Sequence, residues 1–442
     1  MKLPSSLLAS VLVSPLTRRS ISGWHEARRR FRRRPHRIVF YHRVTDAWSW
    51  LLAQLLPRVL QQYEVELETQ LVAALPIDCV SDPQRLDNYS AYDAMRLARA
   101  WQLRFPDAAT PPAADLAHLA GRVILAQPQS LSRLLQATAA AWDGDSQQLA
   151  AMARDDGAAD EQTTAALLGL ASTQLARQGH YLGAMLYFQG EWFWGLDRLG
   201  LLEQRLAARG LRRNEEPPVS EQFQPIERQA AGMAQALDLE FYFSFRSPYS
   251  WLGACRVVEL ADRLGLNLQL RPLLPMVMRG IPVPRRKLRY IITDVARIAR
   301  RDNIPFGPVR DPLGKGVERA LAVFDAANRR DRGRDFMLAA MRAIWCQAAD
   351  LTSTRTLNRL AAVAGLDAAE VEQALQSNSW RAGVEANAAA LAVLGIWGVP
   401  AMCLRDPDAR AATIAWGQDR MWAIERAALG IDVAMPPPRL VQ

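Results

Sequence analysis

Residues 241–252 read FYFSFRSPYSWL, an apolar run that leads through a Ser-Pro-Tyr-Ser turn into a second apolar segment. The pattern predicts a strand that turns directly into a helix, with Pro248 at the first helical position and Ser247 just before it. The N-terminus of a helix stabilises negative charge. We therefore predict that Ser247 can stabilise a thiolate that a small molecule brings to this turn. The simpler alternative is that Ser247 only caps the helix.

Ser247 and Ser250 have the spacing of the two cysteines in Cys-x-x-Cys oxidoreductases, but serines cannot form a disulfide. The four cysteines of the chain are scattered without a close pair. Their placement predicts a reducing, cytoplasmic environment and argues against a zinc site or a disulfide framework, so we expect no metal.

The chain has 442 residues, half of them apolar, which is enough for two domains. Its net charge of +9 resides in residues 1–37, where ten Lys and Arg face Glu26 alone (10 − 1 = +9). The remaining 44 basic and 44 acidic residues cancel, so we expect no specific nucleic-acid partner.

We predict a disordered basic tail over residues 1–35, with weak contact to a membrane surface or another anionic partner as the alternative. The charge follows the short apolar run 7–16, which argues against a signal peptide.

Two similar segments occur 201 positions apart. Residues 36–51 read HRIVFYHRVTDAWSWL, and residues 237–252 read LDLEFYFSFRSPYSWL. A second match pairs WGLDRL at 194–199 with WGQDRM at 416–421. Two matches in the same order predict a tandem duplication. The predicted division is a tail over 1–35, a first domain over 36–213, a linker over 214–225 and a second domain over 226–435.

Within the second copy, the pattern alternates between strand and helix signals. The predicted order is a strand over 238–245, a helix over 248–264, a strand over 267–272, a helical region over 285–376, a helix over 380–394, and two strands near 398–404 and 411–416 around a hairpin tip at 406–408. This order predicts an α/β chain of two tandem thioredoxin-like domains, each with an inserted α-helical subdomain.

Four motifs of the second copy resemble the kappa-class glutathione transferases and the 2-hydroxychromene-2-carboxylate isomerases, within the DsbA-like thioredoxin-fold group. They are SPYSWLG at 247–253, LQLRP at 268–272, GVP at 398–400 and GQDRM at 417–421. The resemblance covers residues 238–431. It implies an enzyme that uses glutathione, in which Ser247 hydrogen-bonds the glutathione sulfur.

The resemblance also implies roles for five other residues. Pro400 would be cis, and the Val399 backbone would pair with the glutathione peptide. Gln418 and Asp419 would hold the γ-glutamyl end, and Lys287 would meet the glycyl carboxylate. Each role has a simpler alternative. Pro400 could be a trans proline in a turn, Asp419 could only cap the final helix, and Lys287 could be a solvated cation.

The first copy departs from this pattern. Asp46 stands where Ser247 stands in the second copy, and Gly183-Ala184-Met185 stands in place of Pro400-Ala401-Met402. A fixed carboxylate would repel a thiolate, so we predict a non-catalytic domain that packs on the second as an internal pseudo-dimer. The second copy has its own departure, because the loop from Pro272 to Tyr290 is short and contains no Asn.

The favoured function is a glutathione-dependent isomerase or transferase. Its substrate would be a small hydrophobic or aromatic-derived molecule with a conjugated double bond, to which the thiolate adds. One alternative is a non-catalytic thioredoxin-fold protein that binds a peptide or partner chain beside Pro400. A DsbA-like protein disulfide oxidoreductase is a further alternative.

Overall fold

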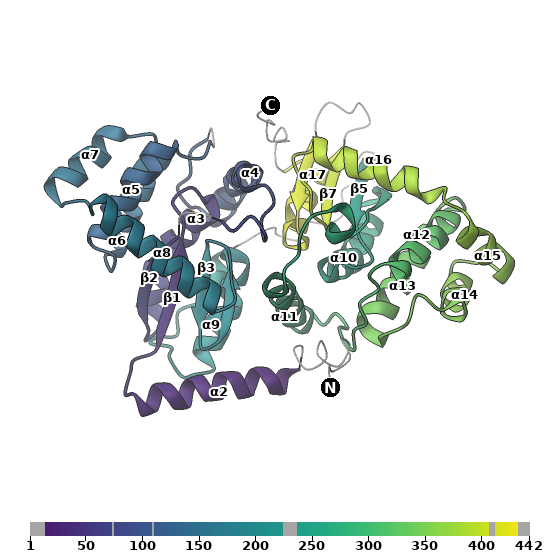
Figure 1. The fold of residues 1–442 in the computed structure, drawn as a ribbon, viewed down its shortest axis with the longest axis horizontal. Helices are drawn as coiled ribbons and strands as arrows, with labels where there is room; N and C mark the ends of the chain where they lie inside the picture. Colours follow the sequence, from purple (N-terminus) through teal and green to yellow (C-terminus); the bar gives the residue numbers. More distant parts are fainter. Residues whose placement is uncertain (1–13, 73–74, 108–109, 224–236, 406–411, 432–442) are drawn as a thin grey trace. The chain divides into compact units, whose positions relative to one another are not determined.

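The computed structural model describes residues 14–72, 75–107, 110–223, 237–405 and 412–431. The chain divides into two compact units, Arg18–Pro225 and Ile226–Gln442 with Met1–Thr17 (Figure 1). The prediction of an α/β chain is confirmed, since each unit combines helices with a four-stranded sheet. The predicted hairpin tip at 406–408 and the end of the predicted linker lie outside the described residues. Within the described residues, no helix has the length and apolar character needed to cross a bilayer.

The C-terminal unit begins with strand, helix and strand. Its described elements are β5 (Asp238–Phe243), α10 (Pro248–Leu264), β6 (Asn267–Pro272), η3 (Met276–Arg279), α11 (Arg285–Arg301), α12 (Lys315–Asn328), α13 (Gly333–Gln347), α14 (Thr354–Val363), α15 (Ala368–Gln376), α16 (Trp380–Val393), β7 (Ala401–Arg405), β8 (Ala412–Trp416), η4 (Gln418–Arg420) and α17 (Met421–Ala428). Helices α11–α16 form the insertion between β6 and β7.

The sheet of this unit has the order β6-β5-β7-β8. Strand β5 pairs parallel with β6 and antiparallel with β7, which pairs antiparallel with β8. Helix α10 contacts β5, α17 contacts β7 and β8, and the two helices contact each other. The end of β5 and the start of α10 therefore lie next to the start of β7, where the predicted site residues are found.

One buried core joins the sheet to the helical insertion. Side chains alternate along a strand, so Phe241 and Phe243 of β5 share a face, where their rings stack at 5.8 Å. Phe243 meets Phe324 of α12, and Phe245 meets Phe336 of α13, each edge to face. The insertion thus packs directly on the strand that leads into the Ser247 turn.

The N-terminal part of the chain has its own sheet. Its described elements are α2 (Pro15–Phe31), β1 (Arg37–His42), α3 (Ala47–Gln62), β2 (Glu66–Leu71), α4 (Pro83–Trp101), α5 (Ala114–Ala126), α6 (Leu131–Trp142), α7 (Ser146–Asp155), α8 (Glu161–Arg177), β3 (Met185–Phe188), β4 (Glu191–Trp194), η1 (Leu196–Arg198), α9 (Leu199–Ala207) and η2 (Val219–Gln222). The sheet order is β2-β1-β3-β4, with the same parallel and antiparallel pairings as the other sheet.

The residue pairs between strands allow the two sheets to be aligned position by position. Met185 pairs with Tyr41 and Trp194, as Ala401 pairs with Tyr242 and Trp416. Ala184 therefore occupies the position of Pro400, and Gly183 occupies that of Val399. The sequence comparison, which set Gly183 opposite Pro400, is wrong by one residue, because pairing with β1 sets the register and the local sequence does not.

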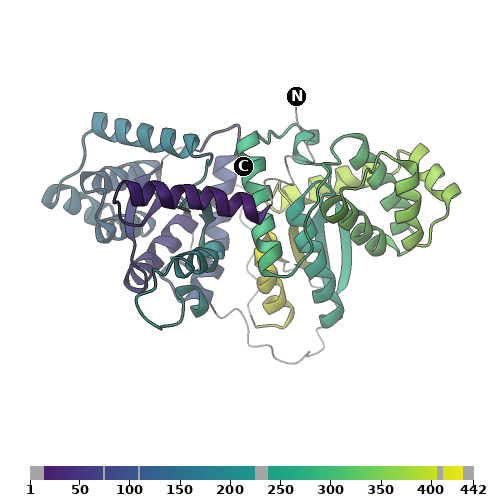
Figure 2. The same cartoon turned by 90° about the horizontal axis from the view of Figure 1, so that it is seen from below.

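The prediction of a disordered tail over 1–35 is wrong for its described part. Residues 15–31 form α2, one uninterrupted helix at the purple end of the chain (Figure 2). Ser22 and Glu26 are buried, and both bond the side chain of Gln189 in the β3–β4 turn, at 3.2 and 2.8 Å. Arg209 also donates to the Ser22 carbonyl at 3.2 Å. This packing on the sheet gives a strongly basic segment a fixed helical conformation.

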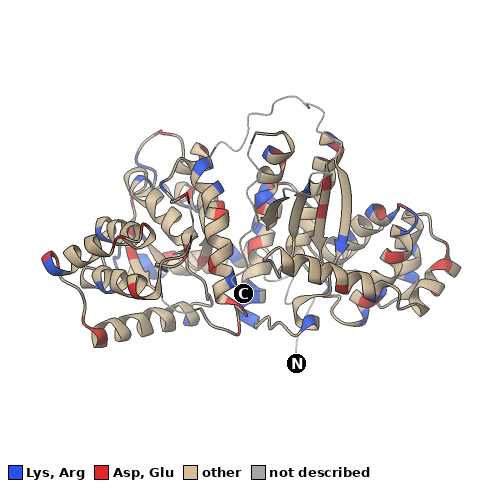
Figure 3. Cartoon of the chain, turned by 90° about the horizontal axis from the view of Figure 1, so that it is seen from above, with Lys and Arg blue, Asp and Glu red and all other residues tan. Residues whose placement is uncertain are grey.

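Lys and Arg are interspersed with Asp and Glu over the described surfaces of both units (Figure 3). This mixture agrees with the cancellation of charge beyond residue 37. The end of α2 and the residues that follow it form one basic segment, and α11 forms another, with seven Lys and Arg against Asp294 alone.

Candidate functional site

Ser247 lies at the turn between β5 and α10, as predicted. It is the N-cap of α10, and its Oγ accepts a hydrogen bond from the Ser250 backbone N–H at 3.1 Å. The Ser250 hydroxyl is buried and accepts from the Ser244 N–H at 3.3 Å. The two serines thus hold the turn together without covalent linkage. Ser247 itself remains partly exposed.

The Val399–Pro400 peptide bond is cis, which confirms that expectation. Ser247 Oγ donates to the Val399 carbonyl oxygen at 3.4 Å, so the turn and the proline loop meet directly. Helix α10 also runs close to this loop, because a Cβ on Gly253 would lie 3.3 Å from the Phe241 ring and 3.4 Å from Pro400 Cβ. A Cβ on Gly398 would lie 2.6 Å from the Trp416 ring, so this loop position requires glycine.

Gln418 and Asp419 directly follow Gly417, whose backbone N–H donates to the Pro400 carbonyl oxygen at 2.9 Å. Gln418 is buried and its amide is engaged at both ends, accepting from Arg256 and donating to Asp419. Arg256 also bonds Asp302 of the insertion. Gln418 therefore positions Asp419, which is itself partly exposed.

Lys287 lies in the first turn of α11 and is partly exposed. Asp294 lies seven residues, about two turns, further along the same face of α11. Asp294 is fully buried, accepts from Tyr249 Oη at 2.7 Å and pairs with Arg297 at 2.8 Å. This cluster joins α11 to the start of α10, and Lys287 lies about two helical turns from it along α11.

Sequence reasoning missed two contributors to this region. Tyr249 stands inside the Ser-Pro-Tyr-Ser turn, but its partner Asp294 is 45 residues away and carries no local signal. Arg279 of η3 donates to the Trp397 carbonyl at 2.6 Å, just before the cis-proline loop. Burial lowers the pKa of the Arg279 guanidinium below its usual value. The short loop after β6 thus supplies a cation at the residue that precedes the cis-proline loop.

The cysteines lack the features of activated thiols. All four are free thiols. Burial raises the pKa of Cys255 and of Cys346 to about 11, and that of Cys403 to about 12. A reactive cysteine requires the opposite shift. Among the described residues, no group of three or more His, Cys, Asp or Glu side chains could hold a metal ion.

The corresponding turn of the N-terminal unit contains Asp46, which caps α3 and accepts from the Ser49 hydroxyl at 2.7 Å. Asp46 is 4% exposed, and burial raises its pKa to about 6. The Ser49 hydroxyl accepts from the Arg43 N–H at 3.3 Å, as Ser250 does from Ser244. It also accepts from the Ala184 N–H at 2.6 Å, a donor that Pro400 lacks. A buried carboxylate therefore fills this turn.

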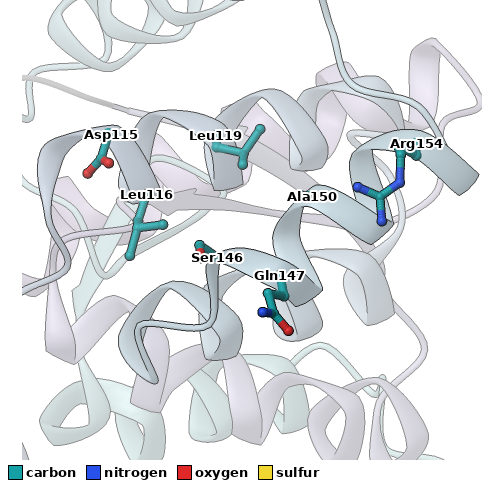
Figure 4. Close-up of a pocket in the computed structure, with 7 residues that line it drawn as sticks. All are labelled: Asp115, Leu116, Leu119, Ser146, Gln147, Ala150 and Arg154. Carbon is teal, nitrogen blue, oxygen red and sulfur yellow. The ribbon is translucent and has the colours of Figure 1, made fainter.

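A groove of about 610 Å³ lies between α5 and α7 of the N-terminal unit. Figure 4 shows Leu116 and Leu119 along it, between Asp115 and Arg154. None of its lining residues is a predicted site residue, and it holds no cluster of titratable groups. We therefore assign the chemistry to the Ser247 region and not to this groove.

Comparisons with known proteins concern the C-terminal unit. The DSBA-like thioredoxin domain family matches residues 238–428. The 2-hydroxychromene-2-carboxylate isomerase of Sphingobium xenophagum is 26% identical over 199 residues, 42% of this chain and 95% of that protein. The isomerase of the same name from Pseudomonas putida is also 26% identical over 199 residues, 43% of this chain and 93% of that protein.

Two solved structures cover the same share of the chain. A structure of 2-hydroxychromene-2-carboxylate isomerase is 24% identical, with a TM-score of 0.37, over 43% of this chain and 94% of that one. The cytosolic disulfide reductase DsbM from Pseudomonas aeruginosa is 21% identical, with a TM-score of 0.33, over 44% of this chain and 100% of that one. The match to this family over residues 238–428 shows that the C-terminal half of this chain contains a DsbA-like thioredoxin domain.

Proposed function

We propose that the C-terminal domain is a glutathione-dependent isomerase or transferase of the 2-hydroxychromene-2-carboxylate isomerase type. Its substrate would be a small hydrophobic molecule with a conjugated double bond. The observation that carries the proposal is the contact of the Ser247 hydroxyl with the cis Val399–Pro400 loop at the N-terminus of α10. The two isomerase relatives, aligned over nearly their whole length, support the reaction class.

The donor set of the site fits glutathione. The Ser247 hydroxyl donates over 3.4 Å to Val399, a long bond that a charged acceptor can replace. The tripeptide carries two carboxylates and one amino group. Lys287 and Arg279 are cations suited to a carboxylate, and Asp419, held by Gln418, is suited to the amino group. In this assignment Gln418 acts through Asp419.

Glutathione would supply a thiolate that adds to the conjugated double bond of the substrate. The former double bond can then rotate, and elimination of the thiolate restores it, which completes a cis–trans isomerisation. The task of the protein is to keep the sulfur ionised. Lowering a thiol pKa by two units from about 8.5 requires about 2.7 kcal/mol. A hydrogen bond from Ser247 to a charged acceptor contributes about 1.5–3 kcal/mol. The N-terminus of α10 adds about 0.3–1 kcal/mol. The two effects together supply about 1.8–4 kcal/mol, a range that includes the required free energy without a histidine.

We propose further that the N-terminal unit is a duplicated, non-catalytic copy of the same domain. The two sheets have the same strand order, and Ala184 and Pro400 occupy equivalent positions in them, which supports a common origin. Asp46 replaces the hydroxyl donor with an acceptor, and its charge opposes a thiolate. The copy would therefore keep the architecture without the chemistry.

Isothermal titration of the full chain with reduced glutathione tests the proposal. We expect binding that is weakened about 10- to 100-fold by Ser247→Ala, because a hydrogen bond of about 1.5–3 kcal/mol to the thiolate is lost. Asp46→Ala serves as the matched substitution in the other unit and should leave binding unchanged. An absence of glutathione binding to the unaltered chain would leave the non-catalytic binding protein as the better assignment.

A further inference from the structure

We propose that the exposed face of α2 binds the surface of an anionic phospholipid bilayer. This inference does not depend on the proposed enzymatic function. It starts from the orientation of the helix, since one face of α2 is held against the β3–β4 turn and the opposite face is open. On the held face, a Cβ added to Gly190 would lie 2.7 Å from Ile21 and 2.9 Å from His25.

The open face of α2 carries large apolar side chains. Trp24 is 57% exposed and Phe31 is 90% exposed, and Leu16 is also exposed. At 100° per residue, these three positions fall within an arc of about 80°. Gly23 and Ala27 lie in or beside the same arc and are exposed. Ser20 also falls within this arc and is exposed, so the face is an apolar stripe interrupted by one hydroxyl. Its two aromatic side chains are not buried by the described residues of their own unit.

Arginines flank the stripe and follow it. Arg28 lies over the Trp24 ring, with Cζ 5.3 Å from its centroid. Arg32, Arg33 and Arg34 come directly after the helix and are all exposed. Within the described chain, no carboxylate pairs with Arg28 or with these three residues. The acidic side chain of α2, Glu26, is buried and already bound by Arg29 and Arg30.

This combination fits a bilayer surface. A helix with Trp, Phe or Leu on one side and arginines beside it lies in the plane of the interface, with its apolar stripe at the acyl boundary. Anionic headgroups attract each nearby arginine strongly enough to improve binding about fivefold. A nucleic acid would use the arginines through its phosphates, but it would leave Phe31 and Leu16 in water. The exposed apolar stripe therefore favours the bilayer.

The test is co-sedimentation of the full chain with vesicles of phosphatidylcholine, with or without phosphatidylserine, at about 0.1 M salt. We expect binding to the anionic vesicles that falls sharply at about 1 M salt, where screening reduces the Debye length to about 3 Å. Trp24→Ser with Phe31→Ser should weaken binding at least about tenfold, since the variant lacks the two aromatic side chains that would enter the bilayer. Arg28→Gln with Arg32→Gln should weaken it about 25-fold.

Matched substitutions are available in the other unit. Val363 and Val393 are exposed apolar residues, and Arg355 and Arg359 are exposed arginines. The corresponding double variants, to Ser and to Gln, should bind anionic vesicles like the unaltered chain. The proposal fails if the chain does not bind anionic vesicles, or if these controls weaken binding equally. It also fails if a single-stranded DNA oligonucleotide binds in preference to vesicles and only the arginine substitutions matter.

Discussion

Ser247 and Val399 meet through one hydrogen bond, from the serine Oγ to the carbonyl oxygen, over 3.4 Å. The same oxygen atom of Ser247 accepts the Ser250 N–H at 3.1 Å. The Ser247 oxygen therefore caps the helix through one lone pair, while the long bond to Val399 holds the hydroxyl proton only weakly. The hydroxyl can therefore turn its proton to an anion without giving up the cap.

Ser247→Asp separates these two roles. Aspartate is a good N-cap, and Asp46 caps α3 in this way at the equivalent turn. We expect unfolding free energy within about 0.5 kcal/mol of the unaltered chain, with loss of glutathione binding through repulsion of the thiolate. Urea unfolding and isothermal titration would measure the two effects. Ser353→Ala, which removes the cap of α14, should do the reverse and lower stability by about 1 kcal/mol without changing binding.

Gly183→Ala should destabilise the N-terminal unit by about 1–3 kcal/mol, because the site is already full. The new Cβ would lie 2.8 Å from Asp46 Oδ2 and 2.9 Å from Ser49 Oγ, both buried. Gly169 lies within α8 with nothing near its Cβ position, so Gly169→Ala should stabilise by about 0.5–1 kcal/mol. Urea unfolding of both variants measures the contrast. Equal stability of the two variants would mean that Asp46 does not occupy the turn as described.

Asp46→Asn should change the dependence of stability on pH. Burial raises the pKa of Asp46 from its usual 3.8 to about 6, so the native chain holds this proton more tightly than the unfolded chain. The protonated Asp46 therefore contributes to the free energy of unfolding at low pH. This contribution, at most about 3 kcal/mol, is lost as pH rises from about 4 to about 6. We expect the asparagine variant to gain about 1–3 kcal/mol relative to the unaltered chain between these limits.

Chemical unfolding at several pH values provides the check. The buried His42, whose pKa is lowered to about 3, changes stability in the opposite direction over the same range. Both proteins contain His42, so its effect cancels in their difference. A difference that stays constant with pH would show that the pKa of Asp46 in the native chain is not raised above its value in the unfolded chain.

The thiols should react slowly in the native chain. A pKa near 11 for Cys255 and Cys346, against an ordinary value of 9, lowers their thiolate fraction about 100-fold at neutral pH. Labelling with a disulfide reagent should accelerate strongly in denaturant, and insulin reduction should not be detectable. Turnover of insulin that is lost with Cys255→Ser would instead favour a disulfide oxidoreductase.

Local signals in the sequence predicted the elements around Ser247 closely. The helix over 248–264 and the strand over 267–272 have the observed bounds, because Ser-Pro at the start and Gly265 after the end mark the helix. The strand at 238–245 ends two residues earlier, at Phe243. Residues close in sequence determine these features, so one chain suffices to find them.

Features that depend on distant partners were not predictable. The Tyr249–Asp294 bond and the Arg279 contact with Trp397 join residues 45 and 118 positions apart. The helical conformation of residues 15–31 was missed for the same reason. Its composition suggests disorder, and its packing depends on Gln189, more than 150 residues later.

The Ser250 hydroxyl bears on how this domain could change over evolution. It stands where a disulfide oxidoreductase would carry its second cysteine, yet it is buried and satisfies the Ser244 N–H. A thiol is a poorer acceptor, and leaving a buried N–H poorly satisfied costs about 1–3 kcal/mol. Installing two cysteines by simple replacement would therefore loosen the turn before any redox activity appeared. The serine pair thus opposes the conversion of this turn to disulfide chemistry.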